Sequence, residues 1–479
     1  MVGSSGGGVL RTLGDDWRRL FRQMRVTVGA GHTRPGLYQY RFGQNGDSVR
    51  LHLRVQDDGC GLLFVNVGDV VHLTGGATEI ARMVLDGASP QAVTGLLATR
   101  HPETDQAAIA ADVATIAGVV ESLQRPTDGC PTCALEVERT DIFSQRATAP
   151  YKADLALTYE CNNRCAHCYN EVARVGQASR LSAVGTGETP VHRTSHWREV
   201  LRRLAAIGVP HIIFTGGEPT LHEGLVDLVA HAERLGLVSG LNTNGRRLSE
   251  PGLAPRLARA GLDHVQITLA SHRPEVHNEA VGADAFDETV QGIQSALAAG
   301  LHAITNTTLT RANRDHILQV VDFVAGLGVT TFAMNGMICA GGGRCNDATL
   351  REAELVPILE AVRDRARDLA MRFLWYTPTQ YCRLSPVALG LGPKACNAAE
   401  YSICIEPDGG VLPCQSYYQP AGNILRDDWP AIWDSALFRR LRERREQPRA
   451  AGLPEKCWTC DSLTTCGGGC MLGLKCVEG

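Results

Sequence analysis

The chain has 479 residues, of which 44% are hydrophobic and 20% are charged, and its formal net charge is −4. This composition is typical of a globular protein, and the length predicts roughly three domains. A nearly neutral balance gives no electrostatic signature of nucleic acid or of an anionic membrane surface, so we expect neither as a partner.

Cysteine usage predicts the compartment. The chain has 17 cysteines, an odd number that cannot all pair. The N-terminus lacks the apolar core of a secretory signal, and no uncharged apolar run reaches the ~18 residues that span a bilayer. In a reducing compartment thiols serve metals or catalysis more often than disulfides, so we expect a cytoplasmic protein.

After an N-terminal extension over residues 1–47, a small domain is expected at residues 48–125. Its elements are a hairpin at 51–55 and 61–67 and helices at 78–85, 90–99 and 107–123. A small sheet with three helices is typical of a winged helix. A DNA-binding wing is one interpretation, but residues 107–123 contain no basic side chain, which a recognition helix needs.

Turn-forming residues indicate a linker at 126–149. Strand-like and helix-like segments then alternate over residues 150–345, which predicts a parallel sheet. Evenly repeated units favour a curved, partial barrel over an open sheet. The expected strands are 154–158, 211–215, 238–242, 264–269, 303–308 and 331–335. In either architecture the site should lie at the carboxyl ends of the strands.

Three cysteines, Cys161, Cys165 and Cys168, follow the first expected strand with the spacing C-x3-C-x2-C. Three thiolates on one tight loop can hold three irons of a four-iron cluster, whereas an electron-transfer cluster normally has four cysteines. The open metal position lets a bound metal act on a ligand. The alternative is a zinc site with a fourth ligand such as His167, although zinc ligands usually come in pairs from two separate turns.

Two polar turns follow the second and third expected strands. The first, Gly-Gly-Glu-Pro at residues 216–219, combines flexible backbone with a carboxylate and can bind an amino group. The second is Thr-Asn-Gly at 243–245. The alternative for the first is a tight turn before a helix capped near Thr220.

The C-terminal region is expected at residues 375–479, after a bridging helix at 346–374, and it carries more than half of the cysteines. Five have the spacing C-x2-C-x5-C-x3-C-x5-C from Cys457 to Cys476, and an earlier pair, Cys396 and Cys414, lies on either side of a glycine-containing turn. Two zinc ribbons are the alternative to iron–sulfur clusters, because C-x2-C knuckles serve zinc equally well.

With these motifs, residues 150–345 resemble a radical S-adenosylmethionine (SAM) enzyme with a partial (β/α)6 barrel similar to a TIM barrel. The resemblance implies that Cys161, Cys165 and Cys168 ligate a 4Fe-4S cluster whose open iron is chelated by SAM. One electron from a flavodoxin or ferredoxin-type donor would release a 5′-deoxyadenosyl radical that takes a hydrogen from the substrate. The positions implied near SAM are Gly216, Gly217, Glu218, Pro219, Thr243, Asn244, Ser271 and His167.

Two positions depart from many radical SAM enzymes. His167 stands where an aromatic residue usually precedes the third cysteine, and we expect it to stack over the adenine rather than to transfer a proton. Thr268-Leu-Ala270 stands where many relatives have Ser-Leu-Asp. Because this chain lacks the carboxylate, the substrate or cofactor contact that those relatives make from this position is not carried over to Ala270 with any strength.

The C-terminal cysteines resemble those of the SPASM extension, which binds two auxiliary iron–sulfur clusters, so three 4Fe-4S clusters are implied. The implied ligands of the first auxiliary cluster are Cys396, Cys414 and Cys470. Those of the second are Cys457, Cys460, Cys466 and Cys476. As the fourth ligand of the first auxiliary cluster we prefer Cys382 to Cys404. If neither binds, a substrate thiolate could dock at the open iron.

Residues 48–125 resemble the small PqqD-like peptide-binding domain, through the pattern of residues 62–67, 71–73 and 80–87 together with Asp112. In that family a leader peptide adds as a strand to the edge of the sheet. The alternative is a capping domain without a ligand. The three parts together imply a radical SAM enzyme that matures a ribosomally made precursor peptide with a leader segment.

The expected product is an oxidative crosslink in the peptide, as a thioether, carbon–carbon or ether bond. A crosslink removes two hydrogens, and the auxiliary clusters could accept the second electron. Epimerisation is an alternative, with Cys339, just past the last expected strand, as a hydrogen-atom donor. A folded protein or a small molecule is the alternative substrate, as in sulfatase maturation or tetrapyrrole modification. The sequence assigns no role to Cys60, Cys130, Cys133 and Cys345.

Overall fold

The structure, a computed structural model, divides into two compact units. One comprises residues 1–148 and 205–210, and the other comprises residues 149–204 and 211–479. The barrel and the C-terminal cysteine region therefore belong to the same unit. The residues that the structure describes are 22–24, 33–43, 49–66, 69–124, 138–139, 147–170, 193–344 and 346–476.

The N-terminal unit contains a mostly antiparallel sheet with the strand order β2-β3-β4-β5-β1-β6. The expected hairpin is confirmed as β3 (Val49–Val55) and β4 (Gly61–Val65). The strands that the sequence analysis missed are β2 (Gly36–Phe42), β5 (Asp69–Leu73), β1 (Arg22–Met24) and β6 (Glu138–Arg139). In β2 aromatic and polar residues alternate from Tyr38 to Phe42, which is a strand signal that the sequence analysis did not use.

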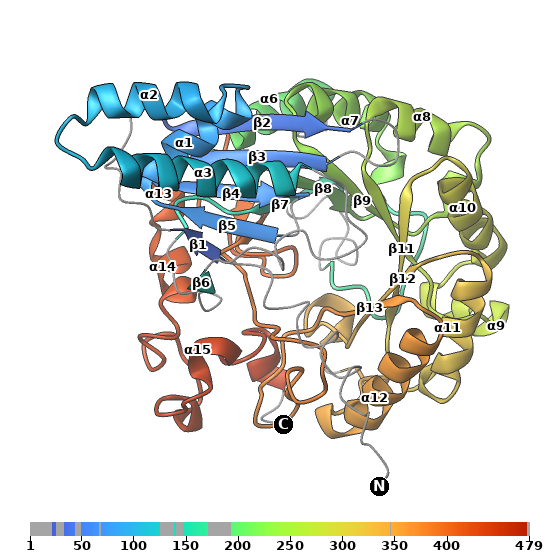
Figure 1. Ribbon diagram of the computed structural model, residues 1–479. Helices are drawn as coiled ribbons and strands as arrows, with labels where there is room; N and C mark the ends of the chain where they lie inside the picture. Colours follow the sequence, from blue (N-terminus) through green and yellow to red (C-terminus); the bar gives the residue numbers. More distant parts are fainter. Residues whose placement is uncertain are drawn as a thin grey trace, which may run out of the picture. The chain divides into compact units, whose positions relative to one another are not determined.

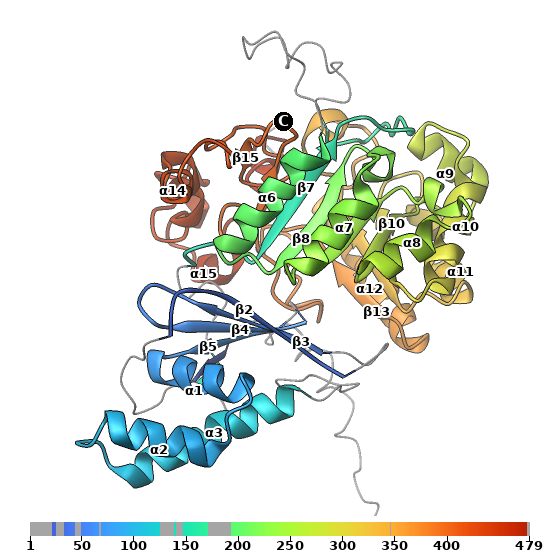
Figure 2. The ribbon, with the colours of Figure 1, turned by 90° about the horizontal axis from the view of Figure 1, so that it is seen from above.

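Three helices cover one face of this sheet: α1 (Gly75–Leu85), α2 (Pro90–Arg100) and α3 (Gln106–Leu123) (Figure 2). Each begins after a side-chain N-cap, from Thr74, Ser89 and Asp105 respectively, which accepts a backbone N–H bond. Helix α3 is, among the described residues, long and apolar enough to suit a membrane span. Its apolar stripe instead joins the core of this unit, together with side chains of α1, α2 and the sheet.

The second unit is built on a nine-stranded sheet with the order β13-β12-β11-β10-β9-β8-β7-β14-β15. The six expected barrel strands are confirmed as β7 (Lys152–Thr158), β8 (His211–Gly216), β9 (Val238–Thr243), β10 (His264–Thr268), β11 (His302–Thr308) and β12 (Thr331–Asn335). They pair in parallel in chain order, and β13 (Arg372–Trp375) extends them.

Helices follow one another around the outside of this curved sheet (Figure 1). They are α6 (Thr194–Ala206), α7 (Leu225–Arg234), α8 (Leu253–Ala260), α9 (Pro274–Val281), α10 (Phe286–Ala298), α11 (Ile317–Gly326) and α12 (Glu352–Asp368). In α7 the buried residues Leu225, Leu228, Val229 and Ala232 recur at helical spacing, so one face packs on the sheet.

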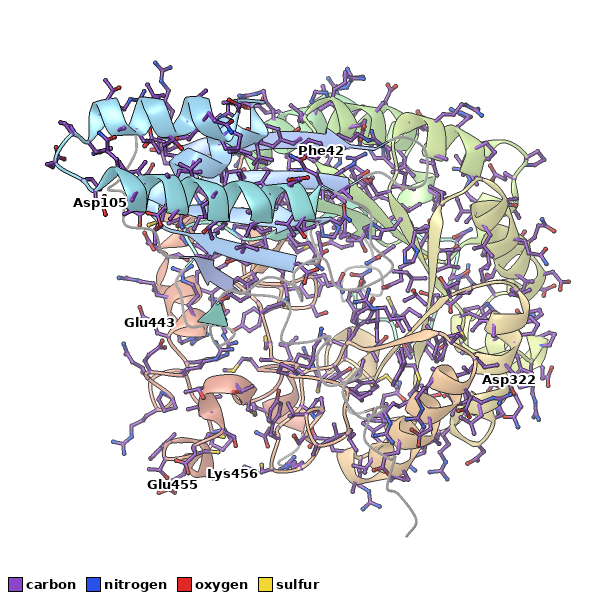
Figure 3. The ribbon with its side chains drawn as sticks, viewed as in Figure 1. Phe42, Asp105, Asp322, Glu443, Glu455 and Lys456 are labelled. Carbon is purple, nitrogen blue, oxygen red and sulfur yellow. The ribbon has the colours of Figure 1, made fainter. Side chains whose placement is uncertain are left out.

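The C-terminal region adds strand β14 (Ser402–Ile405) in parallel beside β7, and β15 (Val411–Leu412) follows it. Its helices are short: α13 (Trp429–Trp433), α14 (Ala436–Arg442) and α15 (Leu463–Cys466). Figure 3 shows Glu455 and Lys456, which directly precede Cys457, at the edge of this region. The pairing of β14 with β7 brings the C-terminal cysteines to the strand that precedes the cysteine triplet.

Candidate active site

The carboxyl ends of β7, β8 and β9 lie side by side, because these strands pair in parallel, with one register shift between β7 and β8 at Ala156–Thr158. The cysteine triplet follows β7, the Gly-Gly-Glu-Pro turn overlaps the end of β8, and the Thr-Asn-Gly turn overlaps the end of β9. The sheet therefore brings together three motifs that lie far apart in the sequence.

Backbone contacts hold the cysteine loop against helix α9. The amide of Arg164 donates to the carbonyl of Val281 at 2.8 Å, and a Cβ on Gly282 would lie 2.4 Å from the carbonyl oxygen of Arg164. Gly282 also has a φ of +64°. Only glycine allows both this conformation and the close approach, so α9 ends where the loop can rest on it.

The three thiols of the loop suit an iron–sulfur cluster. Burial, followed by the charges of Cys168 and Cys161, raises the pKa of the Cys165 thiol to about 12. Burial, followed by the charges of Glu218 and Cys168, raises the pKa of the Cys161 thiol to about 11. Three thiolates here are costly without positive charge, which the irons of a cluster supply while keeping the thiols deprotonated.

Among the described residues, no three His, Cys, Asp or Glu side chains gather so as to hold a single metal ion. The thiolates of a four-iron cluster do not share one ion, since each binds a different iron. Burial lowers the pKa of His167, so its ring is neutral near pH 7. The prediction that His167 stacks on adenine stays a prediction.

Glu218 is fully buried and links the ends of β8 and β9. Its Oε1 accepts hydrogen bonds from the backbone of Thr220 at 3.0 Å and from the hydroxyls of Thr220 and Thr243 at 2.5 and 2.7 Å. Its Oε2 accepts from the backbone of Asn244 at 2.8 Å. Burial raises the pKa of Glu218 although these bonds oppose the shift. Oε2 keeps capacity for another donor, such as an amino group.

Gly216 and Gly217 allow the β8 turn to lie directly on the start of the cysteine loop. A Cβ would lie 2.2 Å from the carbonyl oxygen of Thr158 at Gly216, and 2.3 Å from that of Glu160 at Gly217. The amides of Gly217 and Glu218 donate to these two carbonyls at 2.7 and 2.8 Å. These amides are therefore already engaged within the protein.

The β9 turn is also tied to the cysteine loop. The side-chain amide of Asn244 donates, through Nδ2, to Oδ1 of Asn162 at 2.7 Å. The guanidinium of Arg246 donates to the carbonyl of Asn162 at 2.5 Å and to Oδ1 of Asn163 at 3.1 Å. The sequence analysis missed Arg246, because nothing in its neighbourhood along the chain points to a loop that precedes it by more than eighty residues.

Ser271 lies just beyond β10, fully buried. Its hydroxyl lies 3.0 Å from Nε2 of His316 and accepts from the amide of Arg273 at 3.0 Å. These contacts position the loop between β10 and α9. Contact between Ser271 and a cofactor stays a prediction.

The structure has Cys339 in a disulfide, a form that carries no S–H hydrogen, and its role as a hydrogen-atom donor stays a prediction. The glycine-rich segment after it has a different contact. The amide of Gly342 donates to the carbonyl of Cys168 at 2.7 Å, and a Cβ on Gly341 would lie 2.6 Å from the same oxygen. This segment therefore supports the cysteine loop from the β12 side.

The C-terminal cysteines fall into two sets. The first is Cys396, Cys414 and Cys470: burial, then the charges of Cys396 and Cys470, raises the pKa of Cys414 to about 12. The second contains Cys457, Cys460 and Cys466, because the charges of the latter two add to burial in raising the pKa of Cys457. These are the sets that the sequence predicts. The side chain of Cys476 lies outside the described residues.

The structure places Cys382 beside the second set, against our preference for the first. The amide of Tyr381 donates to the sulfur of Cys466 at 3.4 Å, and that thiol donates to the carbonyl of Thr379 at 3.7 Å. Cys382 also adds to the charge that raises the pKa of Cys457. Cys404 is buried on β14, and Cys414 is among the groups that, after burial, raise its pKa. Cys404 therefore lies near Cys414 of the first set.

Comparison with known proteins agrees with this arrangement. Residues 155–324 match the radical SAM superfamily, and residues 396–461 match the SPASM iron–sulfur cluster-binding domain. The PqqA peptide cyclase of Streptomyces rochei is 30% identical over 332 residues, which cover 67% of this chain and 84% of the relative. That of Xanthomonas axonopodis pv. citri is 29% identical, with 70% and 86% covered.

Solved structures of Streptococcus suis SuiB share the fold. SuiB bound to S-adenosylmethionine matches with a TM-score of 0.62 at 16% sequence identity, covering 90% of this chain and 96% of SuiB. SuiB bound to its precursor peptide SuiA also has a TM-score of 0.62, with 91% and 97% covered at 16% identity. The fold likeness therefore extends beyond the barrel and the C-terminal region into the N-terminal unit.

Proposed function

Because this chain belongs to the radical SAM enzymes with a SPASM domain, the family that includes the PqqA peptide cyclases, we propose that it forms a crosslink in a ribosomally made precursor peptide. The observation that carries the proposal is the joining of the cysteine triplet and Glu218 at one edge of a parallel barrel, with two further cysteine sets in the same unit. The identity to peptide cyclases supports the substrate class.

In this proposal Cys161, Cys165 and Cys168 hold the SAM-binding cluster, and Oε2 of Glu218 accepts from the amino group of SAM. When bound, SAM supplies a 5′-deoxyadenosyl radical that removes a hydrogen atom from the peptide. The engaged amides of Gly217 and Glu218 keep the two loops in fixed register, so the site is organised before its ligands arrive.

The two C-terminal cysteine sets would hold two auxiliary clusters, which makes three 4Fe-4S clusters with the first. A crosslink removes two hydrogens, and clusters held by these two cysteine sets could accept the second electron. A flavodoxin or ferredoxin-type protein would supply the electron that first reduces the SAM-binding cluster. A reducing cytoplasm suits both the thiols and this donor.

We assign the N-terminal unit to the leader segment of the peptide, as a PqqD-like domain. Its sheet ends in β2, which pairs with β3 on one side. A leader could add as a strand to such an edge, with affinity from main-chain hydrogen bonds. Tyr38 and Tyr40 on this strand contact the guanidinium of Arg82, which could meet an acidic leader side chain.

The deciding experiment is anaerobic incubation of the reduced, cluster-loaded enzyme with SAM and candidate precursor peptides. We expect 5′-deoxyadenosine and a peptide that has lost two hydrogens, both measured by mass spectrometry. An unchanged mass with one deuterium gained from solvent would indicate epimerisation instead. A peptide that is never altered, alongside a folded protein or small molecule that is, would overturn the proposed substrate class.

A further inference from the structure

Two hydrogen-bonded side chains connect the cysteine triplet to the first C-terminal cysteine set. Tyr169 directly follows Cys168, and Gln415 directly follows Cys414. The hydroxyl of Tyr169 donates to Oε1 of Gln415 at 3.1 Å. A single hydrogen bond therefore completes a path of covalent bonds from a ligand of the SAM-binding cluster to a ligand of the first auxiliary cluster.

The surroundings of this bond hold it in place. Asn170, the next residue, is buried, donates to the carbonyl of Gly216 at 2.7 Å and accepts from the hydroxyl of Tyr418 at 2.6 Å. The boundary between the barrel and the C-terminal region is thus packed and hydrogen-bonded at this point.

Other tyrosines nearby lack this placement. The hydroxyl of Tyr159 donates to Glu406 at 3.0 Å, and neither residue adjoins a proposed cluster ligand. Tyr418 lies four residues beyond Cys414, and its partner Asn170 lies two beyond Cys168. Of the described side-chain bonds across this boundary, that of Tyr169 and Gln415 gives the shortest route through bonds between the two cysteine sets.

We propose that Tyr169 and Gln415 are positioning residues that carry electronic coupling between the first auxiliary cluster and the SAM-binding cluster. The inference rests on the proposed oxidative crosslink, in which the peptide loses one hydrogen atom to the radical and then one electron and one proton. The electron would enter the cluster held by the first C-terminal cysteine set. It would leave along Cys414, Gln415, Tyr169 and Cys168 for the cluster held by the triplet, so that the first of these clusters returns to its starting oxidation state.

No bond forms or breaks at Tyr169 or Gln415 in this step, and the proton leaves from the peptide to solvent. The Tyr169 side chain acts as a bridge and is not itself oxidised. Returning the electron in this way would allow repeated turnovers with little further external reductant.

The test uses the full chain, loaded with iron and sulfide, in the variants Tyr169→Phe and Gln415→Leu. Flash photoreduction followed by rapid-freeze electron paramagnetic resonance measures how fast an electron redistributes between the clusters. We expect redistribution to slow several-fold in both variants, with iron, sulfide and the spectrum of each cluster retained. Gln415→Glu keeps an accepting oxygen and should restore the rate.

Tyr418→Phe is the matched control, because it removes a buried hydroxyl at the same boundary without breaking the shorter path. Its redistribution rate should stay near that of the unaltered enzyme. Unaltered rates in fully loaded Tyr169→Phe and Gln415→Leu would overturn the inference, as would an equal loss in Tyr418→Phe. The measurement needs no peptide, so failure of the crosslinking proposal would show separately, as absence of product.

Discussion

The barrel edge and the C-terminal cysteine region present the same kind of ligand on different supports. At the barrel edge, three long parallel strands, the Glu218 hydrogen bonds and glycine contacts fix the loops to one another. The C-terminal region has two short strands, and its helices α13, α14 and α15 have five, seven and four residues. The first site is organised by the fold, whereas we infer that the second depends on its clusters.

Cys168→Ala should have the largest effect on activity and yet leave the barrel folded. Removing one of three ligands should abolish the SAM-binding cluster and the formation of 5′-deoxyadenosine. The barrel should remain folded, because its strands and helices do not depend on this thiol. Iron analysis, activity and circular dichroism measure the three effects. Cys60→Ala, in the N-terminal unit, is the control and should change none of them; an unfolded Cys168→Ala barrel would contradict the comparison.

Cys466→Ala should have the opposite structural result. Its thiol contacts both Thr379 and Tyr381, so its loss removes a cluster ligand and loosens two segments together. We expect one cluster's iron to be lost and the C-terminal region to become sensitive to limited proteolysis, because metal binding and folding are coupled in such regions. A protease-resistant variant lacking that iron would show that the region folds without its clusters.

Arg444→Met should destabilise the C-terminal region while leaving the barrel intact. Arg444 is fully buried and donates to the carbonyls of Cys396, Leu441 and Gly467. Arg444 also pairs with Glu400 at 3.5 Å, and breaking a buried ion pair costs about 3 to 5 kcal/mol. Denaturant unfolding followed by region-specific proteolysis should locate the loss. Arg426→Met, at an exposed site, should unfold like the unaltered protein.

Gly216→Ala should show how far the barrel edge depends on close backbone packing. The new Cβ would lie 2.2 Å from the carbonyl of Thr158, at a residue whose φ is +131°. Strain of this kind costs about 1 to 3 kcal/mol, and the shifted turn should also weaken SAM binding. Differential scanning calorimetry would measure the loss of stability, and titration calorimetry would measure the affinity for SAM.

Gly252→Ala is the matched control for Gly216→Ala, because Gly252 has a φ of +87° but nothing within 4 Å of its Cβ position. It should cost about 1 kcal/mol from backbone strain alone and leave SAM binding unchanged. Equal effects of the two variants would mean that packing against Thr158 contributes nothing.

The repeating pattern of the chain was enough to predict the six barrel strands, since each is a short apolar segment with turn residues after it. The resemblance to the SPASM extension likewise implied two C-terminal sets, and the structure brings Cys396 and Cys470 near Cys414, and Cys460 and Cys466 near Cys457. The pairing of strand β14 with β7 escaped prediction, because it joins residues that lie some 250 positions apart. Local periodicity carries no information about such a partner.

By itself, the sequence determined which residue types are present and at what spacing, and this identified the cysteine triplet, the Gly-Gly-Glu-Pro turn and the family. Only the tertiary structure decided which groups meet. It placed Cys382 beside Cys466, put Cys339 in a disulfide and joined Tyr169 to Gln415. Spacing along the chain constrains contacts within one loop, whereas contacts between loops depend on strand pairing and packing of the whole unit.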